Sequence, residues 1–121
     1  MNALIVDDSR AIYAMVSQML IEEGHKTFWA EDGVKAVELL TLNKDIHIVL
    51  LDWNMPNMNG IEFLEKNMKE KLTASPVIMM TTENSAEKIQ LALKFGAAEY
   101  IMKPFTKDIL LNKISMVEFY D

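Results

Sequence analysis

The stretch IHIVLLDWNMPNMNG, residues 46–60, places an almost continuous apolar run directly before a single carboxylate, Asp52, and a group of turn-forming residues. Such a run is typical of a parallel strand that is covered on both faces. Further short apolar runs have the same character and lie at residues 3–6, 26–30, 76–81 and 98–102. We therefore predict five strands, with residues 46–51 as one of the central ones.

Segments with helical spacing of apolar residues lie between and after these runs. They cover about residues 9–23, a segment that opens at EDG (31–33), and about residues 59–71, 84–95 and 106–120. Strands that alternate with helices of this length indicate a parallel sheet, because parallel strands need long crossover connections. The sequence thus predicts an α/β fold of five β–α units, doubly wound, in one domain over residues 1–121 without an output domain.

The composition excludes several classes of function. The chain has 121 residues, with 12 Lys and Arg against 18 Asp and Glu, so its formal net charge is −6. A surface that binds nucleic acid or an anionic membrane needs clustered cations, so neither partner is expected. The absence of cysteine excludes disulfides and thiolate metal sites. No apolar stretch approaches the roughly 20 residues that span a bilayer, and we expect a cytoplasmic protein.

Chemically useful side chains stand where the predicted strands end. They are Asp7, Asp8, Asp52, Thr81 and Lys103. In an open parallel sheet, ligands bind beyond the carboxyl ends of the strands. We therefore expect these side chains to meet at one edge of the sheet.

Each of these residues also has a purely structural explanation. Asp8 or Ser9 would cap the first helix, and Asp52 would belong to a turn. Thr81 is a common strand residue, and Lys103-Pro104 would simply end a strand. These explanations would have to hold independently of one another, so their convergence on a single edge favours a functional site.

The residue types at this edge suggest phosphoryl transfer. Neighbouring carboxylates repel one another and favour a bound cation, and a site made only of oxygen ligands suits Mg²⁺. A carboxylate such as Asp52 can act as a nucleophile and form an aspartyl phosphate. Lys103 and Thr81 offer an ammonium and a hydroxyl to the oxygens of the transferred group.

Four motifs together resemble the receiver domain of bacterial two-component response regulators. They are IVDDSR (5–10), VLLDWNMPNMNG (49–60), MMTTE (79–83) and YIMKPFT (100–106). The resemblance extends over essentially the whole chain, and it is strongest to the members that act in chemotaxis. It implies a flavodoxin-like sheet with strand order 2-1-3-4-5.

The resemblance also implies a role for each residue of the site. Asp52 would be the phosphoacceptor, and Lys103 would contact the phosphoryl group, with its bond to Pro104 in the cis form. Asp8 would bind Mg²⁺ directly and Asp7 largely through water. Asp52 and the backbone carbonyl of Asn54 would complete the protein ligands.

Further residues correspond to the switch of the family and to its control of phosphoryl lifetime. Thr81 and Tyr100 would form the switch, in which the hydroxyl moves toward the phosphoryl group and the ring turns inward. Asn54 and Glu83 lie where the family adjusts the lifetime of the phosphoryl group. Thr82 departs from the Ala or Gly of many members and is expected to affect turnover.

The fourth predicted helix suggests a surface for a protein partner. Ile89 and Leu93 form one i,i+4 pair and Leu91 and Phe95 another, roughly 200° away at 100° per residue. We expect one pair to face the sheet and the other to face outward. The outward pair would form a docking patch with Tyr100 and the last helix, with Lys113 at its border, on the face that the family uses for output.

The leading hypothesis is a phosphorylation-driven switch that catalyses only its own phosphorylation and dephosphorylation. Its partners would be a histidine kinase, a flagellar motor switch or other protein target, and a phosphatase. A phosphorelay intermediate, which passes phosphate to a second histidine protein, is an alternative. An aspartyl-phosphate hydrolase is disfavoured by Asn54, where such enzymes need an acid, and a flavin-binding module by the charges of Asp7 and Asp8.

Overall fold

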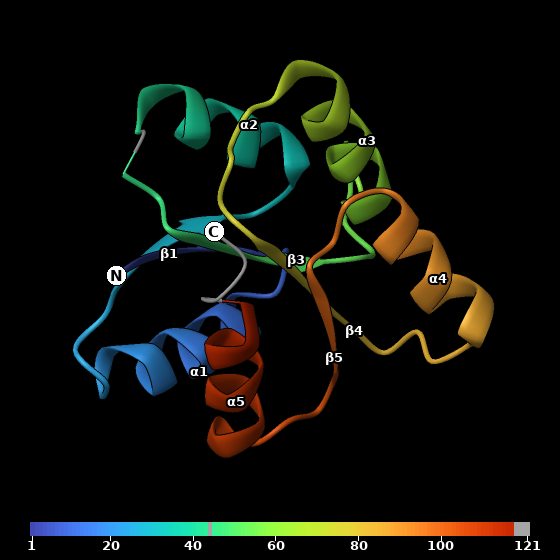
Figure 1. The fold of residues 1–121 in the computed structure, drawn as a ribbon. Coiled ribbons are helices and arrows are strands. Elements are labelled where there is room, and N and C mark those ends of the chain that lie inside the picture. Colours follow the sequence, from blue (N-terminus) through green and yellow to red (C-terminus); the bar gives the residue numbers. More distant parts are fainter. Residues whose placement is uncertain (44, 118–121) are drawn as a thin grey trace.

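The computed structural model describes residues 1–43 and 45–117, which form one parallel sheet with helices on both faces (Figure 1). The strands are β1 (Asn2–Val6), β2 (Lys26–Ala30), β3 (Ile48–Asp52), β4 (Val77–Thr81) and β5 (Glu99–Met102). The helices are α1 (Arg10–Ile21), α2 (Gly33–Leu42), α3 (Gly60–Glu70), α4 (Ala86–Lys94) and α5 (Lys107–Val117). The strand order is β2-β1-β3-β4-β5, which confirms the predicted fold class and order.

Two apolar cores lie on opposite faces of the sheet, because successive side chains of a strand point to opposite sides. In β1, Leu4 and Val6 contribute to the core beneath α2, α3 and α4, whereas Ala3 and Ile5 contribute to the core beneath α1 and α5. Figure 1 shows this division, with α1 and α5 on one side of the sheet and the other three helices on the opposite side. Burial on both faces explains why the central strands are apolar throughout.

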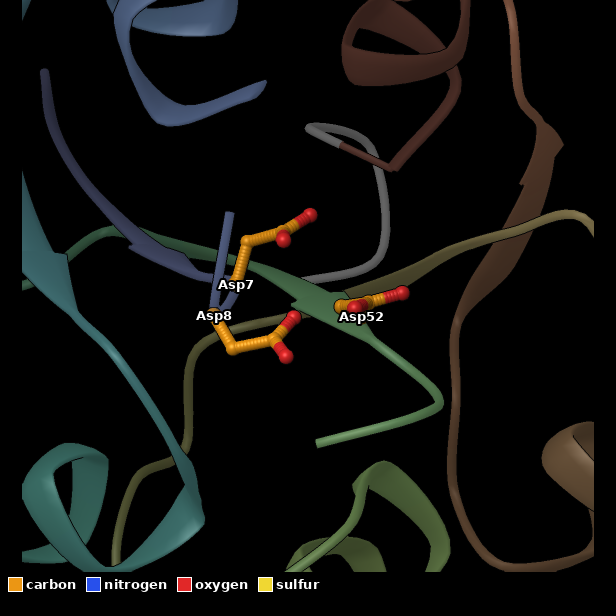
Figure 2. Close-up of side chains that lie close together, drawn as sticks. All are labelled: Asp7, Asp8 and Asp52. Atoms are coloured by element: carbon orange, nitrogen blue, oxygen red, sulfur yellow. The ribbon is translucent and has the colours of Figure 1, made fainter. Parts of the chain in front are cut away.

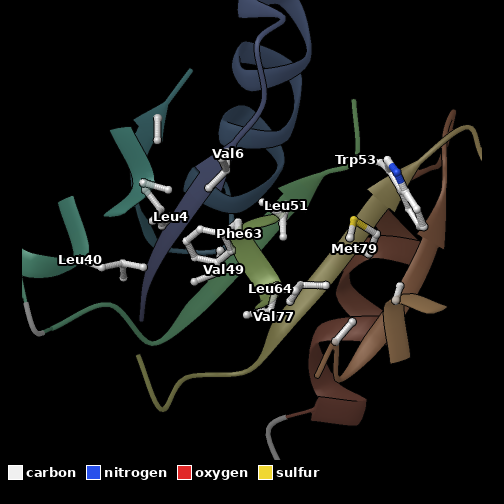
Figure 3. Packing of buried hydrophobic residues seen from close by; sticks show 14 of the residues in the cluster. Leu4, Val6, Leu40, Val49, Leu51, Trp53, Phe63, Leu64, Val77 and Met79 are labelled. Carbon is white, nitrogen blue, oxygen red and sulfur yellow. The ribbon is translucent and has the colours of Figure 1, made fainter. Parts of the chain in front are cut away.

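The packing on the first of these faces is dense around Phe63 of α3. Its ring is fully buried among side chains of β1 and β3 (Figure 3). The labelled neighbours in that view include Leu4, Val49 and Leu51. Asp7 and Asp8 directly follow β1, and Asp52 ends β3, so this core packs against the two strands that lead to the predicted site.

Polar side chains set the starts of four helices. Ser9, Asp32, Asn59 and Ser85 each accept a hydrogen bond from a backbone N–H in the first turn of the helix that follows. The predicted limits were therefore slightly too wide at these ends. The predicted extension of the last helix to Tyr120 lies outside the described residues. Within residues 1–43 and 45–117, no helix has the length and apolar character needed to cross a membrane.

Candidate functional site

Three carboxylates meet at the carboxyl edge of the sheet (Figure 2). Asp7 and Asp8 follow β1, and Asp52 is the last residue of the neighbouring strand β3. One oxygen from each lies within 4.8 Å of the others. The predicted convergence of these acids is confirmed, with the small correction that Asp52 belongs to the strand instead of following it.

Lys103 joins two of these carboxylates. It follows β5, and its Nζ donates to Oδ2 of Asp7 at 2.7 Å and to Oδ1 of Asp52 at 3.1 Å. The peptide bond from Lys103 to Pro104 is cis, as the resemblance implied. The ammonium therefore reaches across β4 and neutralises part of the charge of the acidic group.

Burial shifts the pKa values of two residues in this cluster, Asp52 and Lys103. Asp7 and Asp52 are only 1% and 7% exposed, whereas Asp8 is exposed. Burial first, and then the charge of Asp7, raise the pKa of Asp52, and this rise outweighs the opposing effects of Lys103 and the Trp53 N–H. Burial alone would lower the pKa of Lys103, but its hydrogen bonds and the charges of both carboxylates raise it overall. Lys103 is thus held as a cation beside an acid whose ionisation is costly.

This pKa shift predicts the pH dependence of an Asp52→Asn variant. Asp52 has a higher pKa in the folded state than its unfolded-state pKa of about 3.9. Its contribution to stability is therefore fully present when the pH is below the unfolded-state pKa, and it is lost as the pH rises through the folded-state pKa. We therefore expect Asp52→Asn to be more stable than the parent protein at neutral pH, with a difference that shrinks as pH falls. Urea unfolding in the presence of a chelator, at neutral and acidic pH, measures this difference. A less stable Asn variant at neutral pH would contradict the prediction.

The donor atoms of this group fit a hard divalent cation. Its three carboxylates offer only oxygen ligands, which is the chemistry that Mg²⁺ prefers. Oδ1 of Asp7 accepts from the Ser9 N–H at 2.9 Å, and Oδ2 is occupied by Lys103, so Asp7 is firmly oriented. Asn54 is exposed in the loop that follows Asp52. Residues Asp7, Asp8 and Asp52 could therefore hold a metal ion.

Thr81 and Tyr100 are connected through a single residue, Glu83. Thr81 ends β4 and is buried, and its hydroxyl accepts from the Glu83 N–H at 3.1 Å. Tyr100 of β5 is also buried, and its hydroxyl donates to the Glu83 carbonyl. Burial, with a smaller contribution from the charge of Glu83, raises the pKa of Tyr100. Thr82, between these groups, is exposed.

The predicted division of α4 into an inward pair and an outward pair was wrong. Ala92 is the residue that α4 buries completely, and Ile89 and Phe95 pack beside it against the core. Leu91 and Leu93 are 37% and 45% exposed, so each predicted pair is divided between the two sides. The i,i+4 spacing of the large apolar residues gave the wrong division because a small residue, Ala92, marks the buried face of α4.

Several contacts of the site were not predicted. Of the two expected caps of the first helix, Ser9 takes the role, which leaves the carboxylate of Asp8 free of it. The ion pair of Lys103 with Asp7 and the hydrogen bond from the Trp29 indole to the Asp7 carbonyl, at 2.8 Å, were both missed. The convergence of strand ends did place Lys103 near the acids, but nothing in the sequence pattern indicates which carboxylates it pairs with or which backbone atom an indole will reach.

Known proteins with similar sequence and structure cover nearly the whole chain. Residues 3–115 match the family model described as "Response regulator receiver domain". The chain is 41% identical over 119 residues to a "Chemotaxis protein CheY homolog" of Campylobacter jejuni, which covers 97% of this chain and 92% of the relative. It is 38% identical over 119 residues to "Chemotaxis protein CheY1" of Helicobacter pylori, with 97% and 96% covered. The solved structure of chemotaxis protein CheY4 from Vibrio cholerae is similar with a TM-score of 0.87 and 35% identity, covering 96% of this chain and 97% of that one.

Proposed function

Since the chain belongs to the family of response regulator receiver domains, we infer that it is a phosphorylation-controlled switch of two-component signalling and not an enzyme with an external product. Its similarity to CheY proteins makes it a CheY-like regulator of chemotaxis. The observation that carries this conclusion is the group of Asp7, Asp8 and Asp52 at the sheet edge, with Lys103 bound to two of them.

Asp52 is the proposed phosphoacceptor. Its Oδ1 accepts from both Lys103 and the Trp53 N–H, so these contacts leave Oδ2 for attack on phosphorus. In the transfer from a phosphohistidine, a bond forms from this oxygen to phosphorus while the phosphorus–nitrogen bond breaks. The imidazole leaves with the electron pair and takes up a proton. A Mg²⁺ ion held by the three carboxylates would offset the negative charge of the incoming group.

Lys103, Thr81 and Tyr100 are the proposed links from phosphorylation to a change of surface. Lys103 would exchange part of its contact with Asp52 for a phosphoryl oxygen, and the Thr81 hydroxyl would leave the Glu83 N–H to do the same. Support comes from the contacts that both Thr81 and Tyr100 make with the backbone of Glu83. A movement of Glu83 toward or away from the site would therefore reach the ring of Tyr100.

The proposed output surface consists of α4, β5 and α5. Leu93 is exposed on α4, Ile89 lies half-buried beside the core, and Lys113 of α5 pairs with Glu99 of β5 at 3.1 Å.

We propose a histidine kinase as the phosphate donor and a flagellar motor component as the target. The chain would meet these two partners, and a phosphatase, in the cytoplasm. Asn54, Thr82 and Glu83, which follow the carboxyl ends of β3 and β4, would set the phosphoryl lifetime.

A phosphorylation assay tests the proposed function. With Mg²⁺ and a small phosphoryl donor such as acetyl phosphate, we expect the parent protein to gain one alkali-labile phosphoryl group. The Asp52→Asn variant should gain none, whereas Asp45→Asn, which changes an exposed acid away from the site, should behave like the parent. Label that persists in Asp52→Asn, or a parent protein that takes up no label with any donor, would overturn the proposal.

A further inference from the structure

The indole of Trp29 makes a contact that side-chain packing alone does not explain. Trp29 lies in β2, beside Ile5 of β1, and its Nε1 donates to the backbone carbonyl of Asp7 at 2.8 Å. The ladder between these strands ends at the pair Val6 and Ala30. The side chain of Trp29 thus extends the pairing of the two strands by one further hydrogen bond, at the point where the acids begin.

The path of β2 explains why a side chain fills this role. The Asp7 N–H still donates to the Ala30 carbonyl at 3.0 Å, as in a regular ladder. Two residues later, Asp32 turns away from the sheet to cap α2, and its carboxylate accepts from the Lys35 N–H. The indole therefore satisfies the Asp7 carbonyl where the backbone of β2 has left the sheet.

This contact, together with one other, determines the orientation of Asp8. The peptide before Asp8 is held through its carbonyl by Trp29, and the peptide after it is held through the Ser9 N–H, which donates to Asp7 Oδ1 at 2.9 Å. Because the planes of two successive peptides define φ and ψ of the residue between them, both backbone angles of Asp8 are restrained. The direction of its Cα–Cβ bond is fixed as a result, although its side chain is exposed.

Trp29 is itself held in place. Its ring stacks on Tyr13 of α1, with ring centroids 5.1 Å apart and an angle of 15° between the planes. Thr27, two residues earlier on β2, bonds to Ser17 of α1 at 2.6 Å. These contacts between β2 and α1 therefore hold the indole N–H in position beside the Asp7 carbonyl.

We propose that Trp29 is a positioning residue for the metal site, and that its indole N–H orients the carboxylate of Asp8 by holding the Asp7 carbonyl. The proposal rests on the proposed binding of Mg²⁺ by Asp7, Asp8 and Asp52. Trp29 does not touch the metal. It lowers the cost of ordering Asp8 when the metal binds, because pre-organised ligands lose less conformational freedom on binding.

The Trp29→Phe variant tests this role, because it keeps an aromatic ring against Tyr13 and removes the N–H donor. In a calorimetric titration with MgCl₂, we expect the dissociation constant to rise roughly three- to tenfold, as for the loss of one hydrogen bond. The Tyr13→Phe variant is the matched control, since it keeps the stacking and leaves the Asp7 contact intact. It should bind Mg²⁺ like the parent protein.

A double-mutant comparison separates positioning from a general loosening of the fold. If Trp29 acts through Asp8, then Trp29→Phe should weaken Mg²⁺ binding in the parent but cause no further loss in an Asp8→Asn background. Phosphorylation of Trp29→Phe should also recover at saturating Mg²⁺. Unchanged affinity in Trp29→Phe, or an equal loss in both backgrounds, would overturn the proposal while leaving the proposed function intact. A parent protein that binds no Mg²⁺ would overturn both.

Discussion

Replacement of Lys103 by methionine is expected to lower the free energy of unfolding by about 3–5 kcal/mol at neutral pH without divalent cations. The side chains of Lys103, Asp7 and Asp52 are 13%, 1% and 10% exposed. Methionine retains much of the apolar stem but removes the ammonium. Two buried carboxylates then face each other without the cation that now joins them, which is costlier than the loss of the ion pairs alone.

The pH dependence of the Lys103→Met variant identifies this cause. Loss of the lysine charge removes a factor that lowers the pKa of Asp52, so the raised pKa of Asp52 rises further. Because the folded-state pKa is raised, stability is recovered as the pH falls toward the unfolded-state pKa of about 3.9, and it is lost as the pH rises. We therefore expect the deficit in urea unfolding to shrink in acid, and to shrink also when Mg²⁺ is added at neutral pH.

Lys107→Met is the matched control for this measurement. Lys107 also bonds to two carboxylates, Glu22 and Glu23, at 3.3 and 3.0 Å, but these groups are exposed to solvent. Exposed ion pairs contribute little to stability, so this variant should unfold close to the parent protein. Equal losses in the two variants, or a deficit in Lys103→Met that does not change with pH, would contradict the assignment of Lys103 to a buried ionic cluster.

The order of the elements could be predicted from sequence because a few strong regularities act together. Segments with helical spacing of apolar residues separate the apolar runs, such as residues 46–51. This alternation permits few arrangements other than a parallel sheet, and the carboxyl ends of its strands must then share an edge. This topology is enough to bring Asp7 and Asp8 beside Asp52. The approach of Lys103 could be expected for the same reason.

Contacts that depend on side-chain direction could not be predicted in this way. The buried face of α4 is centred on Ala92, a residue with too little apolar area to stand out beside Leu91 and Leu93. The bond from the Trp29 indole to Asp7 depends on where β2 leaves the sheet, which the periodicity of the strand does not encode. The roles of Asn54 and Thr82 in phosphoryl lifetime stay predictions, because both concern the path of a water molecule.

A Phe63→Ala substitution is expected to lower the free energy of unfolding by about 3–5 kcal/mol, a large share of the roughly 5–15 kcal/mol that stabilises a typical domain. Phe63 is 0% exposed and belongs to the core beneath α2, α3 and α4 (Figure 3). Alanine leaves a cavity among the side chains of β1 and β3. Phe63→Leu should lose less, because leucine fills more of the same space.

The functional outcome of Phe63→Ala should differ from that of Lys103→Met. The three acids stay at the carboxyl ends of β1 and β3, and the other face of these strands still packs against α1 and α5. At a temperature where Phe63→Ala is folded, we expect Mg²⁺ to raise its unfolding free energy by nearly the same increment as in the parent, and Asp52 to accept phosphate. In Lys103→Met, phosphorylation should remain impaired even where Mg²⁺ restores the fold, because the ammonium that would contact the phosphoryl group is gone. Stability and activity that fall together in both variants would show that the core and the site are not separable in this way.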